Sequence, residues 1–327
     1  MDSIPEDVLR SMVPWFLTED VLRIRCVSTT TRTMCQHHII SKYPIKGRLR
    51  YWKSSFPYLK TAAFTRPRSF IEEDFIHMKD IDTLKMTSKF NGIHPSYFKH
   101  LTRLTSLNLQ GSNIKISAYT FYQLTSLSVD YDLSNEDLRQ FTQLTYLSIR
   151  NLPHICYGMH TLVNLRTLDL YNIQDLTDEV FNFIPHLEHL SMTFGELSTR
   201  GISKCKQLKT LHVIGGSQMH TLKGLETLPL LHTVHITYGK IDDSDMAYVS
   251  HIRKLVLYDT TRIQGHGLQY LANLEYLAMY EIPFLDEGIS CLLTLPIRNI
   301  YMYRCREVSL NKKKELTNRL SGRFHSD

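Results

Sequence analysis

The chain has 327 residues, of which 43% are hydrophobic and 21% are charged, a composition that is ordinary for a folded protein. Its length exceeds one simple globular core and suits two domains or a repeat array. Six scattered cysteines without a CxxC pair exclude a disulfide scaffold, MDSIPEDVL is no signal peptide, and no apolar run approaches the ~18 residues of a membrane helix. We therefore expect an intracellular protein, in the cytoplasm or the nucleus.

The first 45 residues are predicted to form a small module of three short helices. Ser3–Glu6 is typical of a capped helix start with proline in the first turn. A second helix is expected from Thr18 and a third from about Ser28. Apolar residues recur at helical spacing in the first of them, at Val8, Leu9, Met12, Val13 and Phe16. So short a module has a small core and usually needs a partner.

Three segments of this module follow a known pattern. Ile4–Leu9 is IPEDVL, Met12–Phe16 is MVPWF and Asp20–Ser28 is DVLRIRCVS. They resemble, without gaps, the Leu-Pro-x-Glu-Leu-Leu, Ile-Leu-Ser-x-Leu and Asp-Leu-Leu-x-x-x-x-Val-Cys/Ser stretches of the F-box family. In that family the F-box docks on a Skp-type adaptor, which links to a cullin scaffold. The resemblance implies adaptor contact through Ile4, Pro5, Leu9, Met12, Val13, Phe16, Leu22 and Ile24.

A basic segment follows the module. Between Val21 and Ile71 the chain has eleven basic residues and no acidic one, so the rest of the chain sums to −5 (from 11 − 5 = +6). Such a segment attracts an acidic partner over long range. It either assists docking on an acidic adaptor or is a solvated flank.

Residues 46–308 carry a repeat of leucine and other apolar residues in the pattern apolar-x-x-apolar-x-x-apolar-x-apolar. Twelve units follow one another at spacings of 20 to 23 residues. Their third apolar positions are Ala62, Leu84, Leu107, Leu127, Leu147, Leu168, Leu190, Leu211, Val234, Leu255, Leu277 and Ile300. The last two apolar positions alternate and so face one side of a short strand. One unit cannot bury its leucines alone, which predicts an α/β leucine-rich-repeat horseshoe with a parallel sheet.

The second half of each unit is predicted to return as a helix. Ser134, Thr177, Asp242 and Asp286 are the expected N-caps, each with acids in the first turn. The units resemble cysteine-containing leucine-rich repeats, but Cys305 is the only one of ten cysteine-ladder positions that holds the family's Cys or Asn. The loop backbone must therefore be satisfied in another way. Residues 309–327 are predicted to form a capping helix from about Ser309.

A candidate binding surface lies on the strand residues that face away from the leucines. Small polar residues occupy this face in the early units, and tyrosines gather on it in the last four. Tyr and Arg are enriched at binding hot spots, although Tyr is also common on strands. We predict substrate binding by Tyr238, Lys254, Tyr258, Tyr276, Tyr280, Tyr301, Tyr303 and Arg304.

Two histidines, His212 and His235, share one column on adjacent strands, about 4.8 Å apart by sheet spacing. A zinc site needs three or four ligands, and only His189 is expected nearby. The cluster of Cys35, His37 and His38 is no stronger a candidate. We therefore predict no metal and no cofactor.

Three functions follow from these patterns. The F-box resemblance and the repeat together favour a substrate receptor of an SCF-type cullin-RING ubiquitin ligase, which holds a protein target and does no chemistry itself. Thr31 stands where the family usually has Trp, which favours the alternative of a ligase-independent interaction scaffold. An enzyme is disfavoured because the chain has no P-loop, GxSxG or HExxH motif. Nucleic acid and membrane partners are not expected.

Overall fold

A computed structural model describes residues 60–64, 69–90, 93–116, 121–130, 133–151, 156–173, 176–193, 197–215, 220–320 and 324–326. The helical module predicted for residues 1–45, with its eight adaptor-contact residues, lies outside them. The chain divides into two compact units, of which the first ends at Arg150 and the second begins at Asn151. Among the described helices, none has the length and apolar composition of a membrane span.

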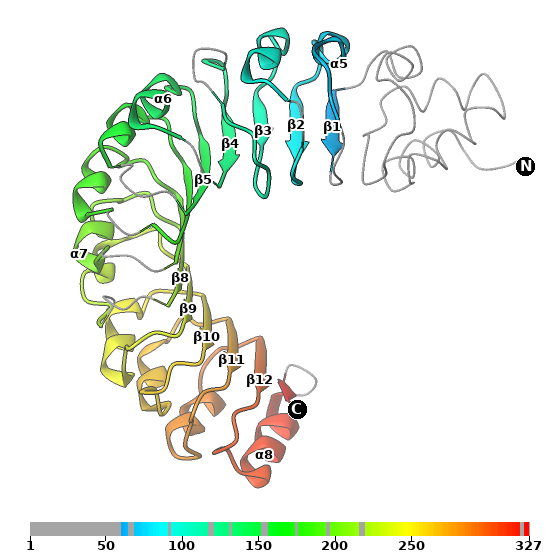
Figure 1. The fold of residues 1–327 in the computed structure, drawn as a ribbon. Helices are drawn as coiled ribbons and strands as arrows, with labels where there is room; N and C mark the ends of the chain where they lie inside the picture. The colour runs from blue at the N-terminus through cyan, green and yellow to red at the C-terminus, as the bar shows by residue number, and fades with distance from the viewer. Residues whose placement is uncertain are drawn as a thin grey trace, which may run out of the picture. The chain divides into compact units, whose positions relative to one another are not determined.

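Unit 1 contains a parallel sheet whose strands pair in chain order (Figure 1). Its strands are β1 Thr61–Phe64, β2 Thr83–Met86, β3 Ser106–Asn108, β4 Ser126–Val129 and β5 Tyr146–Arg150. Its helices are α5 Glu72–His77, the 3₁₀ helix Pro95–His100 and α6 Asn135–Gln140. An aromatic cluster closes the core of its first repeats, with Phe75 in edge contact with Phe70 and Phe98.

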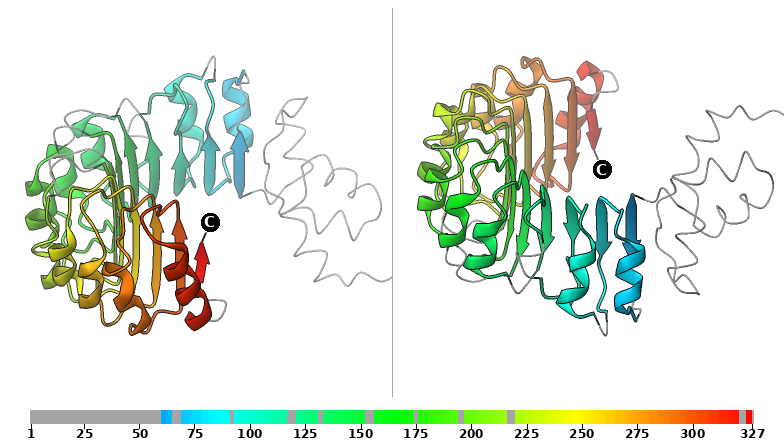
Figure 2. Two further views of the ribbon diagram at one scale, coloured as in Figure 1. Left: turned by 90° about the horizontal axis from the view of Figure 1, so that it is seen from below. Right: turned by 90° about the horizontal axis from the view of Figure 1, so that it is seen from above.

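Unit 2 continues the same repeat. Its described strands are β6 Thr167–Tyr171, β7 His189–Thr193, β8 Thr210–Ile214, β9 Thr233–Thr237, β10 Lys254–Tyr258, β11 Tyr276–Tyr280, β12 Asn299–Tyr303 and β13 Phe324–Ser326. Its helices are α7 Thr199–Ile202, α8 Leu310–Leu320 and the 3₁₀ helices Cys156–Thr161, Asp178–Asn182, Leu225–Thr227, Asp243–Val249, His266–Tyr270 and Gly288–Leu293. The helices lie along one side of this sheet and leave its other face open (Figure 2).

The register of the strands is set by the repeat leucines. Leu84 pairs with Leu107 in unit 1, and in unit 2 Leu255 pairs with both Val234 and Leu277. All twelve predicted third positions lie in strands and are at most 2% exposed. Because each leucine packs against the equivalent residues of the neighbouring strands, the core is continuous within a unit. The predicted leucine-rich-repeat fold is confirmed.

The returning segments differ in detail from the predicted helices. Most are short 3₁₀ helices, because about twenty residues per repeat leave little room after the strand and its two loops. Ser134 and Asp242 cap their helices as predicted. Thr177 occupies the N-cap position without a side-chain bond. The prediction for Asp286 is wrong, since its carboxylate accepts the Ser309 N–H instead.

After strands β5 and β8 to β11, the loop is joined to the next strand by backbone groups rather than by a cysteine or asparagine side chain. The residue that follows the strand adopts positive φ, for example 54° at Asn151 and 56° at Tyr238. Its N–H donates to the carbonyl at the end of the next strand, as from Asn151 to Tyr171 at 2.8 Å and from Tyr238 to Tyr258 at 2.9 Å. These backbone bonds take the place of the Cys or Asn side chains that the family pattern has in this loop. The one matching residue, Cys305, is fully buried.

The C-terminal segment is more than a helix. Helix α8 buries Leu316 and Leu320 and is followed by strand β13, which pairs in parallel with β12. Phe324 thereby takes the inward position next to Ile300. The sequence missed this strand because the spacing from Ile300 to Phe324 exceeds that of the other repeats and a helix intervenes.

Candidate protein-binding surface on strands β9 to β13

The outward face of the last strands is determined by the alternation of each strand. In β10, Leu255 and Leu257 are fully buried, so Lys254, Val256 and Tyr258 point to the opposite, helix-free side. The same alternation holds in β11 and β12, where the inward residues are again apolar. Parallel pairing in register then places equivalent outward residues side by side.

One row of tyrosines runs across the strand ends. The rings of Tyr258 and Tyr280 stack with centroids 5.7 Å apart, and those of Tyr280 and Tyr303 stack at 5.3 Å with an interplanar angle of 14°. Tyr238, which follows β9, meets the Tyr258 ring edge to face at 5.8 Å. Tyr280 is thus stacked on both sides, and the four rings form one continuous row.

A second row crosses the same strands nearer their starts. The Lys254 ammonium lies 4.7 Å from the centroid of the Tyr276 ring, a cation–π contact. The rings of Tyr276 and Tyr301 are 5.4 Å apart, and Tyr301 stacks on His325 of β13 at 4.8 Å. His325 was not among the predicted site residues because β13 was not expected. The spacing to Ile300 was the only signal that could have found it.

The structure thus brings the eight predicted substrate-binding residues to one continuous surface. We call this set, Tyr238, Lys254, Tyr258, Tyr276, Tyr280, Tyr301, Tyr303 and Arg304, the tyrosine surface. Tyr238 is 52% exposed and Tyr303 is 36% exposed, whereas the other four tyrosines are partly covered by their neighbours. Stacked side chains lose little further freedom on binding, which lowers the entropy cost for a partner.

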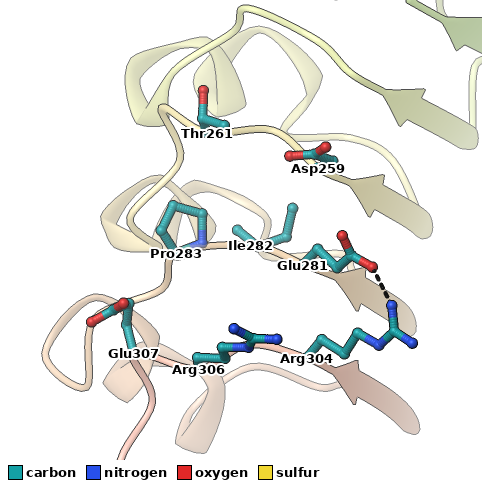
Figure 3. A pocket seen from close by; sticks show the side chains of 8 residues that line it. All are labelled: Asp259, Thr261, Glu281, Ile282, Pro283, Arg304, Arg306 and Glu307. Carbon is teal, nitrogen blue, oxygen red and sulfur yellow. Dashed lines mark hydrogen bonds and ion pairs between the residues drawn. The ribbon is translucent and has the colours of Figure 1, made fainter.

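Charged side chains form a rim along the strand ends. Glu281 accepts a hydrogen bond from the Tyr258 hydroxyl at 3.3 Å and an ion pair from Arg304 Nη1 at 2.9 Å. Beside them is a pocket of about 510 Å³ with Ile282 and Pro283 on its wall (Figure 3). Its other lining residues are Asp259, Thr261, Arg306 and Glu307, together with Glu281 and Arg304. The pocket was missed because loop residues carry no period that predicts their convergence.

The rim residues are held in an unusual backbone conformation. Tyr238, Glu281 and Arg304 have φ of 56°, 58° and 54°, in the left-handed region that favours Gly and Asn. Equivalent positions in earlier repeats of unit 2 hold Asn172 and Gly215. A bulky or charged residue there costs of the order of 1 kcal/mol. The contacts that these side chains make, such as the ring contact of Tyr238 and the ion pair between Glu281 and Arg304, help to offset that cost.

The environment of two tyrosine hydroxyls, those of Tyr258 and Tyr276, favours their protonated form. The negative charge of Glu281, followed by burial, raises the pKa of Tyr258. Burial is the main cause that raises the pKa of Tyr276. Both groups are therefore hydrogen-bond donors at neutral pH, as a polar partner requires.

The two histidines of the predicted column lie beside the tyrosine surface. The rings of His212 and His235 are 5.3 Å apart at an angle of 68°. Burial lowers the pKa of His212, and burial with the nearby charge of Lys254 lowers that of His235 to about 4. No group of three His, Cys, Asp or Glu residues that could hold a metal occurs in the described part of the chain. The pair is therefore neutral at pH 7.

Solved leucine-rich-repeat structures share this fold. An internalin, InlF from Listeria monocytogenes, is similar with a TM-score of 0.57 at 17% identity, over 79% of this chain and 84% of that one. A chain of the Drosophila Toll–Spatzle complex matches with a TM-score of 0.57 at 14% identity, over 82% of this chain and 43% of its own length. A chain of the mouse RP105/MD-1 complex matches with 0.54 at 16%, over 81% and 54%.

At such low identity the likeness establishes the fold and nothing finer. No protein-family model matches the chain, and neither does a curated protein sequence. The chain spans about half the length of the Toll and RP105 chains that it resembles. It is thus a leucine-rich-repeat protein whose function has to be inferred from its own surface.

Proposed function

We propose that the chain is a leucine-rich-repeat interaction scaffold that binds a protein partner on the tyrosine surface. The observation that carries this proposal is the continuity of the surface, in which two rows of rings and a charged rim come from adjacent strands. Strands β10, β11 and β12 each supply two of these residues, on the face opposite the buried core.

A protein partner suits this chemistry best. Tyrosine offers a large apolar area with a polar tip, and tyrosine and arginine dominate the energetics of protein interfaces. The exposed Tyr238 and Tyr303 contribute area that no described residue covers.

The decisive experiment replaces the stacked row. Partners captured by the full-length chain are identified by mass spectrometry, and the affinity of each purified partner is then measured. We expect Tyr258→Ala, Tyr280→Ala and Tyr303→Ala together to weaken binding roughly 100-fold. Tyr122→Ala with Tyr270→Ala is the matched control, since both side chains are exposed and lie off this surface. Unchanged affinity of every partner for the triple variant is the result that refutes the proposal.

A second candidate rests on the N-terminal sequence alone. The ungapped F-box resemblance of Ile4–Ser28 supports a substrate receptor of an SCF-type ubiquitin ligase, with Skp-type adaptor and cullin as partners and an intracellular location. In that case the tyrosine surface holds the substrate. Co-purification of a Skp-type adaptor that is lost on Pro5→Ala with Leu9→Ala supports the ligase function. If no Skp-type adaptor co-purifies, the ligase function is refuted and the scaffold function is the one that remains.

A further inference from the structure

The tyrosine surface has one formal charge within its sheet. In strands β9 to β12, all of which are described, the outward-facing residues are Thr, His, Val, Ala, Asn, Tyr and the single lysine Lys254. The His235 ring is neutral at pH 7 because its pKa is lowered to about 4. A partner that covers this face therefore meets an isolated ammonium group.

Lys254 lacks the carboxylate partner that several basic residues of unit 2 have. Lys209 pairs with Glu188 at 2.5 Å, Arg298 with Glu275 at 3.6 Å and Arg304 with Glu281 at 2.9 Å. Among the described residues, no Asp or Glu oxygen lies within 4.0 Å of the Lys254 ammonium, which is partly buried over Tyr276. A cation–π contact recovers only part of the hydration that such a charge loses.

The nearest acids of the face are engaged or distant. Asp259 and Glu281 follow the ends of β10 and β11, whereas Lys254 begins β10, about 16 Å away along an extended strand. Glu281 already forms an ion pair with Arg304 and accepts a hydrogen bond from Tyr258. On the neighbouring strand, His235 has its pKa lowered partly by the positive charge of Lys254. The local potential around Lys254 is therefore positive.

We propose that Lys254 selects partners that place an Asp or Glu side chain on it while their apolar side chains contact the tyrosine rows. The inference rests on the proposed function and adds the chemistry of the partner. Tyr276 borders Lys254, and its hydroxyl supplies a donor for the second carboxylate oxygen. Covering by the partner excludes water and strengthens the new ion pair.

Peptide display on the full-length chain tests this inference. A library of random linear peptides is panned on the immobilised protein, and enriched peptides are titrated against variants. We expect enrichment of Asp or Glu at one position, roughly tenfold weaker binding to Lys254→Met, and a switch to Lys or Arg with Lys254→Glu. Lys240→Met is the matched control, because that lysine is exposed and lies outside the strands.

The outcomes separate this inference from the proposed function. Peptides that need Tyr258, Tyr280 and Tyr303 but show no acidic preference and bind Lys254→Met equally well overturn the role of Lys254 alone. A library without any tyrosine-dependent peptide contradicts both. A single-stranded RNA probe is titrated in parallel, and its binding with loss on Lys254→Met would assign the lysine to a phosphate backbone and overturn the acidic-peptide inference.

Discussion

The two units both carry apolar inward residues, but the outward residues of the last strands in unit 2 differ from those in unit 1. In unit 1 the outward column holds Asn108, Ser128 and Ser148, of which the two serines are buried, and Gln110 donates to Ser148 at 2.8 Å. In unit 2 the same column begins with Asp169 and Ser191 and continues through His212, His235, Val256 and Ala278 to Tyr301. The unit 1 face satisfies itself with short polar side chains, while the unit 2 face ends in partly open aromatic rings.

This difference shows that the outward strand positions are the ones at which repeats of the same fold can differ in function. Burial of a leucine is required in every unit because the core is continuous, so the inward positions have no freedom. Outward positions meet only their neighbours and a partner, and they can change without loss of the fold. The contrast between outward serines in unit 1 and outward tyrosines in unit 2 is therefore the reason that we propose a binding surface in unit 2.

The largest effect should come from a glycine that packs one repeat of unit 2 onto the previous one. A Cβ on Gly267 would overlap the carbonyl oxygen of Asp243, whose carboxylate also accepts the Gly267 N–H at 2.7 Å. We expect Gly267→Ala to lower the free energy of unfolding by roughly 2–3 kcal/mol, because backbone atoms must move apart. Urea unfolding followed by circular dichroism measures this loss, and hydrogen exchange locates it in β10 and β11.

Gly111→Ala in unit 1 is the matched control. Its φ is 79° and the new Cβ would lie 3.2 Å from the Thr87 carbonyl oxygen, so a loss of about 1 kcal/mol is expected from the left-handed backbone. Equal losses in the two variants would show that the repeats of unit 2 are packed no more tightly than those of unit 1.

The inward half of this fold was predictable because a single physical constraint repeats along the chain. Each third-position residue, such as Leu147 or Leu255, is identified by its period alone and is buried as expected. The eight surface residues could be grouped for the same reason, since strand alternation places them on the open face. Their binding role remains a prediction.

Features without a period could not be predicted. The ladder of positive-φ residues has Tyr238 and Arg304 at positions where propensity favours Gly or Asn, so no local signal marks it. The Asp286 carboxylate bonds to Ser309 of the next repeat rather than capping its own helix, a choice that depends on tertiary distance. Strand β13 is hidden behind helix α8.

A smaller effect is expected on the pH dependence of stability, because His235 in unit 2 occupies the column in which unit 1 has serine. His235 has a pKa of about 4 against an ordinary value of 6.5, with burial as the first cause. Between pH values of about 4 and 6.5, His235 is therefore protonated in the unfolded chain and neutral in the folded chain. The stability that neutral His235 provides is therefore complete above about pH 6.5 and is lost as the pH falls toward about 4.

The test is His235→Ser, which installs the residue that unit 1 has in this column. Between pH 7 and pH 4.5 the wild-type chain should lose more stability than the variant, by of the order of 1 kcal/mol given the partial exposure of the ring. His212, Asp169 and Lys254 stay in place in both chains, so the difference isolates one imidazole. Parallel urea midpoints across the pH range would contradict this role for His235.

The smallest effect tests whether the rim residues are kept for their side chains. Asn172 and Arg304 occupy equivalent left-handed positions with φ of 55° and 54°. Asn172→Arg should lower stability by roughly 1 kcal/mol, since it adds strain and removes the 2.8 Å bond to Asn151. Arg304→Asn should change stability by less than ~0.5 kcal/mol, because relief of strain offsets the loss of an exposed ion pair with Glu281.

Partner affinity should respond in the opposite order. Arg304→Asn removes a cation from the tyrosine surface and should weaken binding several-fold, while Asn172→Arg, well outside that surface, should leave it unchanged. Calorimetry with a peptide selected on the wild-type chain measures both. If Arg304→Asn instead destabilised the chain by more than ~1 kcal/mol and bound the peptide normally, arginine would be present for the fold. The charged rim would then be a structural feature of the last repeats rather than part of the binding surface.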